Sequence, residues 1–229
     1  PTNMPVHDRS ELLPESFWKE NQESKLHPLY RYAVVTDAEE GLILVDVMSL
    51  ADGNPRNNFL ERALTWNPEG ALDGASNLTL AGTRAYVCAP KGLIVVNLDE
   101  PLKPSITAFL GAPDIVNPVA VAVQFRYAFV VDSEGLKVVD VTLPEKPVLK
   151  AKVPMTGIHD VYVARTYAYI AAGPRGMAVL DVEKPEQPGD PGYFDLGGVL
   201  SDTRCIRVAT TNASLFAYVA DGRNGLRVL

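Results

Sequence analysis

The side chains best suited to metal binding or acid–base chemistry are sparse in this sequence. Its three histidines, His7, His27 and His159, are too few and too scattered for a zinc site made of protein ligands alone. A role at the surface or in turns is therefore the favoured interpretation for all three. No nucleophile–base pair, phosphate-binding loop or dinucleotide motif occurs with suitable neighbours. The sequence thus predicts no enzyme activity, no cofactor and no metal.

Aspartates recur at two kinds of position. One set follows short apolar runs and consists of Asp37, Asp132 and Asp221. A calcium site would need the spaced D-x-[DN]-x-[DN]-G series, which is missing, whereas an aspartate in a turn hydrogen-bonds its own backbone two residues on. The second set precedes proline-containing segments and consists of Asp46, Asp140 and Asp181. We interpret both sets as turn or connecting residues rather than ligands.

Composition narrows the class of protein. The chain has 229 residues, 47% of them hydrophobic and 21% charged, which is enough to bury a core without disulfides. The net charge of −7 argues against nucleic acid as a partner, and no apolar run is long enough to span a membrane. We expect Cys88 and Cys205 to be buried free thiols. Without a C-x-x-C-H motif, no c-type haem can attach covalently within this stretch.

A sequence motif that recurs five times predicts the strands that must position these residues. An apolar run precedes a short loop, and a second run then begins at Gly41, Gly92, Gly135, Gly176 or Gly225. The separations are 51, 43, 41 and 49 residues, a period typical of propeller blades. The second copy, for example, reads Ala85-Tyr86-Val87-Cys88 and then Gly92-Leu93-Ile94-Val95-Val96. Each copy predicts a β-hairpin whose loop carries glycine, where a positive φ costs little.

Two further strands complete the predicted unit. An apolar run such as Val161-Tyr162-Val163 precedes the hairpin, and a P-x-x-P pair leads to a fourth strand, as in Pro144-Glu145-Lys146-Pro147. Four antiparallel strands in each period indicate one blade of a β-propeller. The hairpin strands are apolar on both faces, which suits blades packed between neighbours. An open sandwich would alternate more cleanly with polar residues, and it is the second choice.

These units resemble LVIVD repeats, which form β-propellers and share an A-Y-V-A strand, a G-L-x-V-x-D-V strand and a P-x-x-P turn. Five copies occupy residues 30–229; Asn97-Leu98 replaces Asp-Val in the second, and the first has a longer connector. We predict an all-β propeller with blades at about 30–68, 69–112, 113–156, 157–198 and 199–229, the last lacking its outer strand. Residues 1–29 form a polar arm, either a flexible lead-in or a segment that docks through Phe17 and Trp18.

The strand register suggests one candidate ligand site. His159 and Asp160 stand where the inner strand of the fourth blade begins, and Asn117 and Asp202 occupy the corresponding points of the third and fifth blades. Propellers often bind ligands or metals in their central opening. We therefore hypothesise that these four side chains line that opening, while a structural role remains the favoured alternative.

The expected function is a non-catalytic scaffold for protein interaction or ligand binding. The resemblance to LVIVD repeats implies a prokaryotic protein that is secreted, periplasmic or on the cell surface. The chain starts at Pro1 and stops in an apolar run at Leu229, so we interpret it as a segment of a larger protein. An alternative is an accessory domain of a larger redox protein, similar to multihaem cytochromes, with cofactors outside this segment. A hydrolase acting in the central opening is the weakest option.

Overall fold

The computed structural model describes residues 27–50, 54–210 and 214–229. Of the predicted features, His7 and the docking residues Phe17 and Trp18 lie outside these ranges. The described chain consists of strands and four short 3-10 turns, and no helix in it is long and apolar enough to cross a membrane. The prediction of an all-β fold is confirmed.

Eighteen strands form five antiparallel sheets within the described residues, and we call the sheets blades one to five in chain order. Blade one contains β1 (Tyr32–Asp37), β2 (Gly41–Asp46) and β3 (Glu61–Trp66). Blade two contains β4 (Asn77–Ala81), β5 (Arg84–Ala89), β6 (Gly92–Asn97) and β7 (Ser105–Gly111). Blade three contains β8 (Ala120–Gln124), β9 (Tyr127–Val131), β10 (Gly135–Asp140) and β11 (Val148–Pro154). Blade four contains β12 (Asp160–Ala164), β13 (Tyr167–Ala171), β14 (Met177–Asp181) and β15 (Gly192–Phe194). Blade five contains β16 (Cys205–Thr210), β17 (Leu215–Ala220) and β18 (Leu226–Val228).

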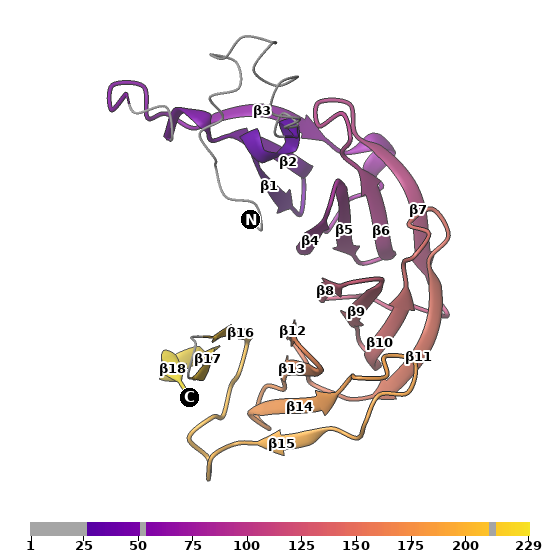
Figure 1. Ribbon diagram of the computed structural model, residues 1–229, viewed down its shortest axis with the longest axis vertical. Helices are drawn as coiled ribbons and strands as arrows, with labels where there is room; N and C mark the ends of the chain where they lie inside the picture. Colours follow the sequence, from indigo (N-terminus) through magenta and orange to yellow (C-terminus); the bar gives the residue numbers. More distant parts are fainter. Residues whose placement is uncertain (1–26, 51–53, 211–213) are drawn as a thin grey trace, which may run out of the picture.

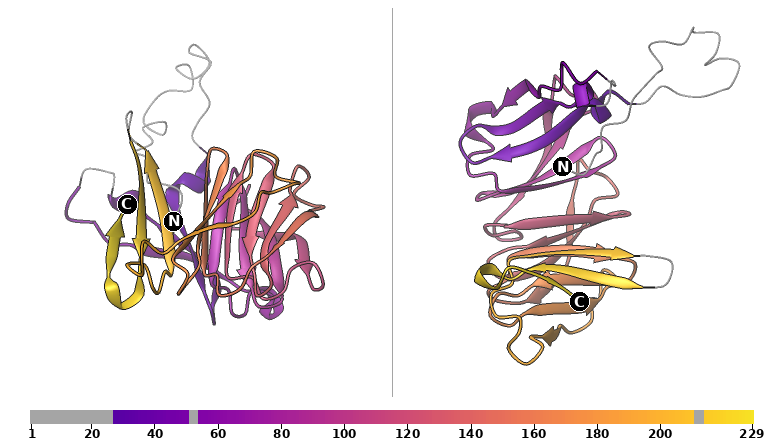
Figure 2. Two further views of the ribbon diagram at one scale, coloured as in Figure 1. Left: turned by 90° about the horizontal axis from the view of Figure 1, so that it is seen from below. Right: turned by 90° about the vertical axis from the view of Figure 1, so that its left-hand side faces the viewer.

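The blades follow one another around an arc, with blades one and five at its two ends (Figure 1). Strands β4, β8, β12 and β16 lie on the inner side of the arc, and β3, β7, β11 and β15 lie on its rim. The sheets stand face to face when the arc is turned (Figure 2). The predicted four strands are present in blades two, three and four. Among the described residues, blade one starts with its hairpin strand and blade five lacks a rim strand.

The core lies between blades, because each sheet is apolar on both faces. We call the face that packs on the following blade the leading face, and the opposite one the trailing face. On the leading face of blade two, Tyr86, Leu93 and Val95 pack against Val130 and Val139 on the trailing face of blade three. The other three junctions repeat this arrangement with equivalent residues. Alternate residues of a hairpin strand therefore serve two different junctions, which explains why the strands show no polar face.

The glycine that opens the second hairpin strand is required by the rim strand as well as by the turn. Gly92 has φ +153, and a Cβ there would lie 2.4 Å from the carbonyl oxygen of Leu110 in β7. Gly135 has φ +150, and its Cβ would lie 2.1 Å from the carbonyl oxygen of Val153 in β11. The repeated glycine thus lets the rim strand approach the hairpin closely.

The aspartate or asparagine that ends this strand closes the same turn in four blades. Its side-chain oxygen accepts a hydrogen bond from the N–H two residues on, at 3.0 Å for Asp46, 2.9 Å for Asn97, 2.9 Å for Asp140 and 2.8 Å for Asp181. Asn97 replaces aspartate without loss because the turn needs only a neutral or charged acceptor oxygen. The predicted turn role is confirmed. The proline pairs that follow hold a backbone turn, such as Lys146 N to Leu143 O at 2.8 Å, before the rim strand.

Candidate functional site

Three of the four predicted site residues come together at the junction between blades four and five. Asp160 opens β12, His159 precedes it, and Asp202 lies in the connector that leads to β16. Asn117 is not part of this group. It lies in the connector that precedes β8 in blade three, and it is exposed with φ +51.

Asp160 fastens two blades to each other. Its side chain is only 7% exposed, and its Oδ2 atom accepts a hydrogen bond from the Ile206 N–H at 2.9 Å and from Arg207 Nη1 at 2.5 Å. The same register recurs two blades earlier, where Asn77 Oδ1 accepts from the Val121 N–H at 3.1 Å. The carboxylate therefore satisfies backbone of the next inner strand, which is a structural task. Sequence reasoning found Asp160 but missed its partners, because they lie 46 and 47 residues further on.

His159 and Asp202 share Arg204. The guanidinium Nε lies 2.6 Å from Asp202 Oδ1, and Nη1 lies 3.4 Å from His159 Nε2. Burial lowers the pKa of His159, the nearby Arg204 lowers it further, and Asp202 opposes both effects. The imidazole is therefore neutral at neutral pH and could accept a proton or ligate a cation, but its ring nitrogen faces a cationic side chain.

The two cysteines are free thiols, as predicted, although only Cys88 is fully buried. Cys205 opens β16, as Asp160 opens β12 in blade four, and the Asp160 carboxylate of the preceding blade lies beside it. Burial and then the neighbouring Asp160 carboxylate raise the pKa of Cys205 to about 11. Burial also raises the pKa of Cys88. Neither sulfur is thus an activated nucleophile at neutral pH, because the thiolate is the reactive form.

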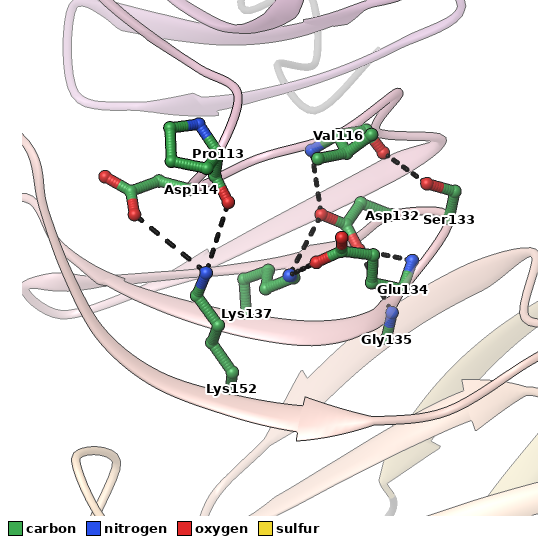
Figure 3. Close-up of polar contacts among 9 residues, drawn as sticks. All are labelled: Pro113, Asp114, Val116, Asp132, Ser133, Glu134, Gly135, Lys137 and Lys152. Atoms are coloured by element: carbon green, nitrogen blue, oxygen red, sulfur yellow. Dashed lines mark hydrogen bonds and ion pairs between the residues drawn. The ribbon is translucent and has the colours of Figure 1, made fainter.

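Two of the three hairpin-loop aspartates, Asp37 and Asp132, accept from the backbone N–H two residues on, as the sequence predicted, whereas Asp221 accepts from the Ser201 and Asp202 N–H groups of a connector. Asp132 is buried: its Oδ1 accepts from the Glu134 and Gly135 N–H groups at 2.9 and 3.0 Å, and its Oδ2 accepts from the Val116 N–H at 2.9 Å (Figure 3). Asp37 accepts from the Glu39 and Glu40 N–H groups at 2.8 and 2.9 Å. These carboxylates therefore close their loops by accepting from backbone N–H groups.

A buried lysine completes the loop of blade three, and the sequence analysis did not single it out. Lys137 is 2% exposed, with Nζ 2.6 Å from Glu134 Oε2 and 3.5 Å from Asp132 Oδ2 (Figure 3). It takes the place that Ile94 holds in blade two. The sequence feature that could have indicated this buried ion pair is a loop aspartate followed, five residues later, by a lysine inside an apolar run.

In blade five, Asp221 and Arg227 stand at the positions that Asp132 and Lys137 hold in blade three. Burial raises the pKa of Asp221, but hydrogen bonds from the Asp202 N–H, the Asn224 side chain and the Ser201 N–H, together with the charge of Arg227, outweigh it, so the net pKa is lowered. Asp221 is therefore held in its charged form by the connector that carries Asp202. Over the described ranges, no three His, Cys, Asp or Glu side chains group as metal ligands would.

A hollow lies on the rim, between blades one and two. This rim groove has a volume of about 680 Å³, and the residues that define it here are Trp66, Glu69, Lys91, Pro104, Ile106 and Phe109. Ile106 and Phe109 belong to β7 and are 39% and 55% exposed. Sequence reasoning missed the groove, because it is assembled from the rim strands of two blades whose residues show no shared motif.

The hydrogen bonds that Asp160 accepts from blade five can be tested by substitution. Asp160→Ala should lower the free energy of unfolding by about 2–3 kcal/mol, because the Ile206 N–H loses its acceptor inside the protein. Asp160→Asn keeps an acceptor, as Asn77 does naturally, and should cost about 1 kcal/mol or less. Urea unfolding of the two variants checks this. Equal losses for both would show that the charge opposite Arg207, and not the backbone bond, stabilises the junction.

Comparison with known proteins agrees with this architecture. The LVIVD repeat family matches residues 119–154, 158–193 and 215–229, which lie in blades three to five. The chain matches no curated protein. Among solved structures, the computationally designed Ika8 protein is similar with a TM-score of 0.59 and 11% identity over 86% of this chain. A functionally unknown protein from Desulfotomaculum acetoxidans DSM 771 is similar with a TM-score of 0.60 and 11% identity over 89% of this chain.

Identities this low show the fold alone. The chain spans 55% of the designed protein and 66% of the Desulfotomaculum protein. The repeat positions read from the sequence, the family matches and the five stacked sheets all agree. This chain is therefore a five-bladed β-propeller in which blades three to five match the LVIVD repeat.

Proposed function

We propose that this propeller is a non-catalytic scaffold whose rim groove binds an extended apolar segment of a partner protein. The observation that carries the proposal is the groove itself, where large apolar side chains are exposed side by side between two rigid sheets. A surface of this kind is a common feature of protein-interaction sites.

The groove has the chemistry for an extended peptide. Trp66 and Phe109 provide aromatic surface, which contributes much of the energy in protein interfaces. Strand β7 is the edge strand of blade two, so its outer backbone groups can pair with an added strand. Lys91 and Glu69 are exposed at the groove and offer one charge of each sign to fix the direction of the peptide.

The remaining polar groups support a scaffold rather than an enzyme. Asp132 and Asp160 are occupied by backbone N–H groups, and the thiol of Cys205 is held protonated. We include in the proposal that the protein is secreted, periplasmic or on the surface of a prokaryotic cell, which rests on the resemblance of its repeats to those of such proteins. The partner is then another protein, or another part of a longer chain.

Peptide selection tests the groove. A display library of random peptides should yield binders rich in apolar residues, and Phe109→Ser should weaken them at least tenfold in a titration that follows Trp fluorescence. Phe125→Ser is the matched control, because Phe125 is 93% exposed in a turn away from the groove. The proposal fails if no peptide is enriched, or if selected peptides bind the Phe109→Ser variant as well as the unchanged protein.

A further inference from the structure

The four rim strands differ at one equivalent position. This position pairs with the residue two places after the repeated glycine, and it holds Thr65 in β3, Phe109 in β7, Lys152 in β11 and Tyr193 in β15. Each rim strand is the outermost strand of its sheet, so its outer backbone groups have no partner strand among the described residues. Such an edge can accept a further strand, and proteins commonly block it with charged side chains.

Three of the four rim strands have a cation at this position. Arg62 donates from Nη1 to Thr65 Oγ1 at 3.3 Å in β3, and in β11 the residue is itself Lys152. In β15, the Arg175 guanidinium lies over the Tyr193 ring, 4.2 Å from its centroid. A strand that approached any of these three edges would have to displace a cation or remove its hydration, which is unfavourable.

Strand β7 has no such cation. Its seven residues, Ser105–Gly111, include no charged residue and no proline. Phe109 is 55% exposed, and no cation–π contact of the described chain involves it. Its ring lies against Gly111, where a Cβ would be only 2.7 Å from Phe109 Cζ. The edge of β7 is therefore uncharged, and its aromatic ring lies along the strand.

The backbone groups of Phe109 point away from its own sheet. Successive residues of an antiparallel strand bond alternately to the strand on one side and to the strand on the other. The Leu98 N–H donates to Thr83 O at 2.8 Å, so every second residue back along β6, including Ile94, bonds to β5 and not to β7. Phe109 lies opposite Ile94, and its N–H and C=O are therefore directed outward.

We infer that the segment bound in the rim groove adds to blade two as a fifth strand, pairing its backbone with Phe109 in β7. This inference rests on the proposed function and defines the class of segment: an extended stretch without charge or proline where it pairs with β7. Its side chains on one face pack on Ile106 and Phe109, which line the groove, so the open edge and the groove are one continuous surface. A charged side chain placed against these two residues would lose its hydration, which excludes charged segments.

Amide hydrogen exchange tests where the segment binds. A peptide obtained from the selection described above should slow the exchange of the Phe109 N–H by about tenfold or more, because that group gains an acceptor. The Lys152 N–H is the matched control, since it stands at the same position of β11, and its exchange should not change. Equal slowing at both amides would overturn the inference, because β7 would then not be the preferred edge.

N-methylation of the same peptide tests how the segment binds. Methylating one amide at a time removes a single N–H donor and leaves the side chains unchanged. Every second amide of an added strand faces β7, so the loss of affinity should alternate along the peptide, about tenfold at one set of positions and about twofold or less at the other. Affinities that do not alternate would overturn the inference.

The outcomes separate this inference from the proposed function. If the peptide requires Phe109 but neither slows its amide exchange nor shows the alternation, the groove binds side chains only. The proposed function then stands and the added strand is overturned. If no peptide is enriched, both are overturned. In the protein without peptide, exchange at Phe109 that slows as protein concentration rises would also overturn the inference, because β7 would then pair with a second copy of the chain.

Discussion

Replacing Asp132 by alanine is expected to lower the free energy of unfolding by about 3–5 kcal/mol, because buried N–H groups lose their acceptor and a buried cation loses one of its two carboxylate neighbours. The Val116 and Gly135 N–H groups lose their carboxylate, and Lys137 keeps only Glu134, whose side chain is 54% exposed. For a chain of this length, the melting temperature should fall on the order of 10 °C.

A double-mutant cycle separates the charge from the backbone bonds. Lys137→Met should cost about 1 kcal/mol or less, because the position accommodates Ile94 in blade two and Asp132 keeps three N–H donors. Asp132→Ala should then cost less in the Lys137→Met background by about 1–3 kcal/mol. Chemical unfolding of the four proteins measures this coupling. If Lys137→Met proves as harmful as Asp132→Ala, the ion pair and not the loop closure dominates.

Gly135→Ala is expected to be equally disruptive for a different reason. The new Cβ would lie 2.1 Å from the Val153 carbonyl oxygen and 2.7 Å from the Met155 nitrogen, at a φ of +150 that side chains rarely adopt. Either β11 must move away from the hairpin or the turn must change, so the loss should exceed about 3 kcal/mol. Amide exchange should locate the damage in β11.

Gly82→Ala is the matched control for that substitution. Gly82 has φ +59, and a Cβ there meets nothing within 4 Å. The equivalent turn residues in blades three and four are Phe125 and Arg165, with φ +53 and +55. Gly82→Ala should therefore lower the free energy of unfolding by about 1 kcal/mol or less, because only the unfavourable left-handed φ of an alanine opposes it. A loss for Gly135→Ala no larger than this would contradict the close approach of the rim strand.

The sequence predicted the parts of this fold that depend on local chemistry. The Gly92-type glycine, the Asp140-type turn and the proline pair recur at fixed places, because each shapes the backbone within a few residues of itself. The two-sided apolar strands predicted stacked blades for the same reason. The strand-by-strand order of the blades could then be derived without tertiary information.

The candidate site depended on contacts that no local pattern encodes. Asp160 was identified as a polar residue at the start of an inner strand, but its use depends on the Ile206 N–H in the following blade. Lys137 is buried only because Asp132 and Glu134 enclose its ammonium group. The rim groove unites Trp66 and Phe109 from two sheets, so it exists only once the blades are stacked.

Because each blade packs only on adjacent blades, the free energy of local unfolding differs from blade to blade. Each sheet contacts mainly the sheet before it and the sheet after it, so stability is close to a sum over blades and junctions rather than a property of one shared core. Among the described residues, blades one and five have three strands each, whereas blade three has four strands, a packed blade on each side and the enclosed ion pair of Lys137. Within the described part of the chain, we therefore expect blade three to be the last to open in partial unfolding.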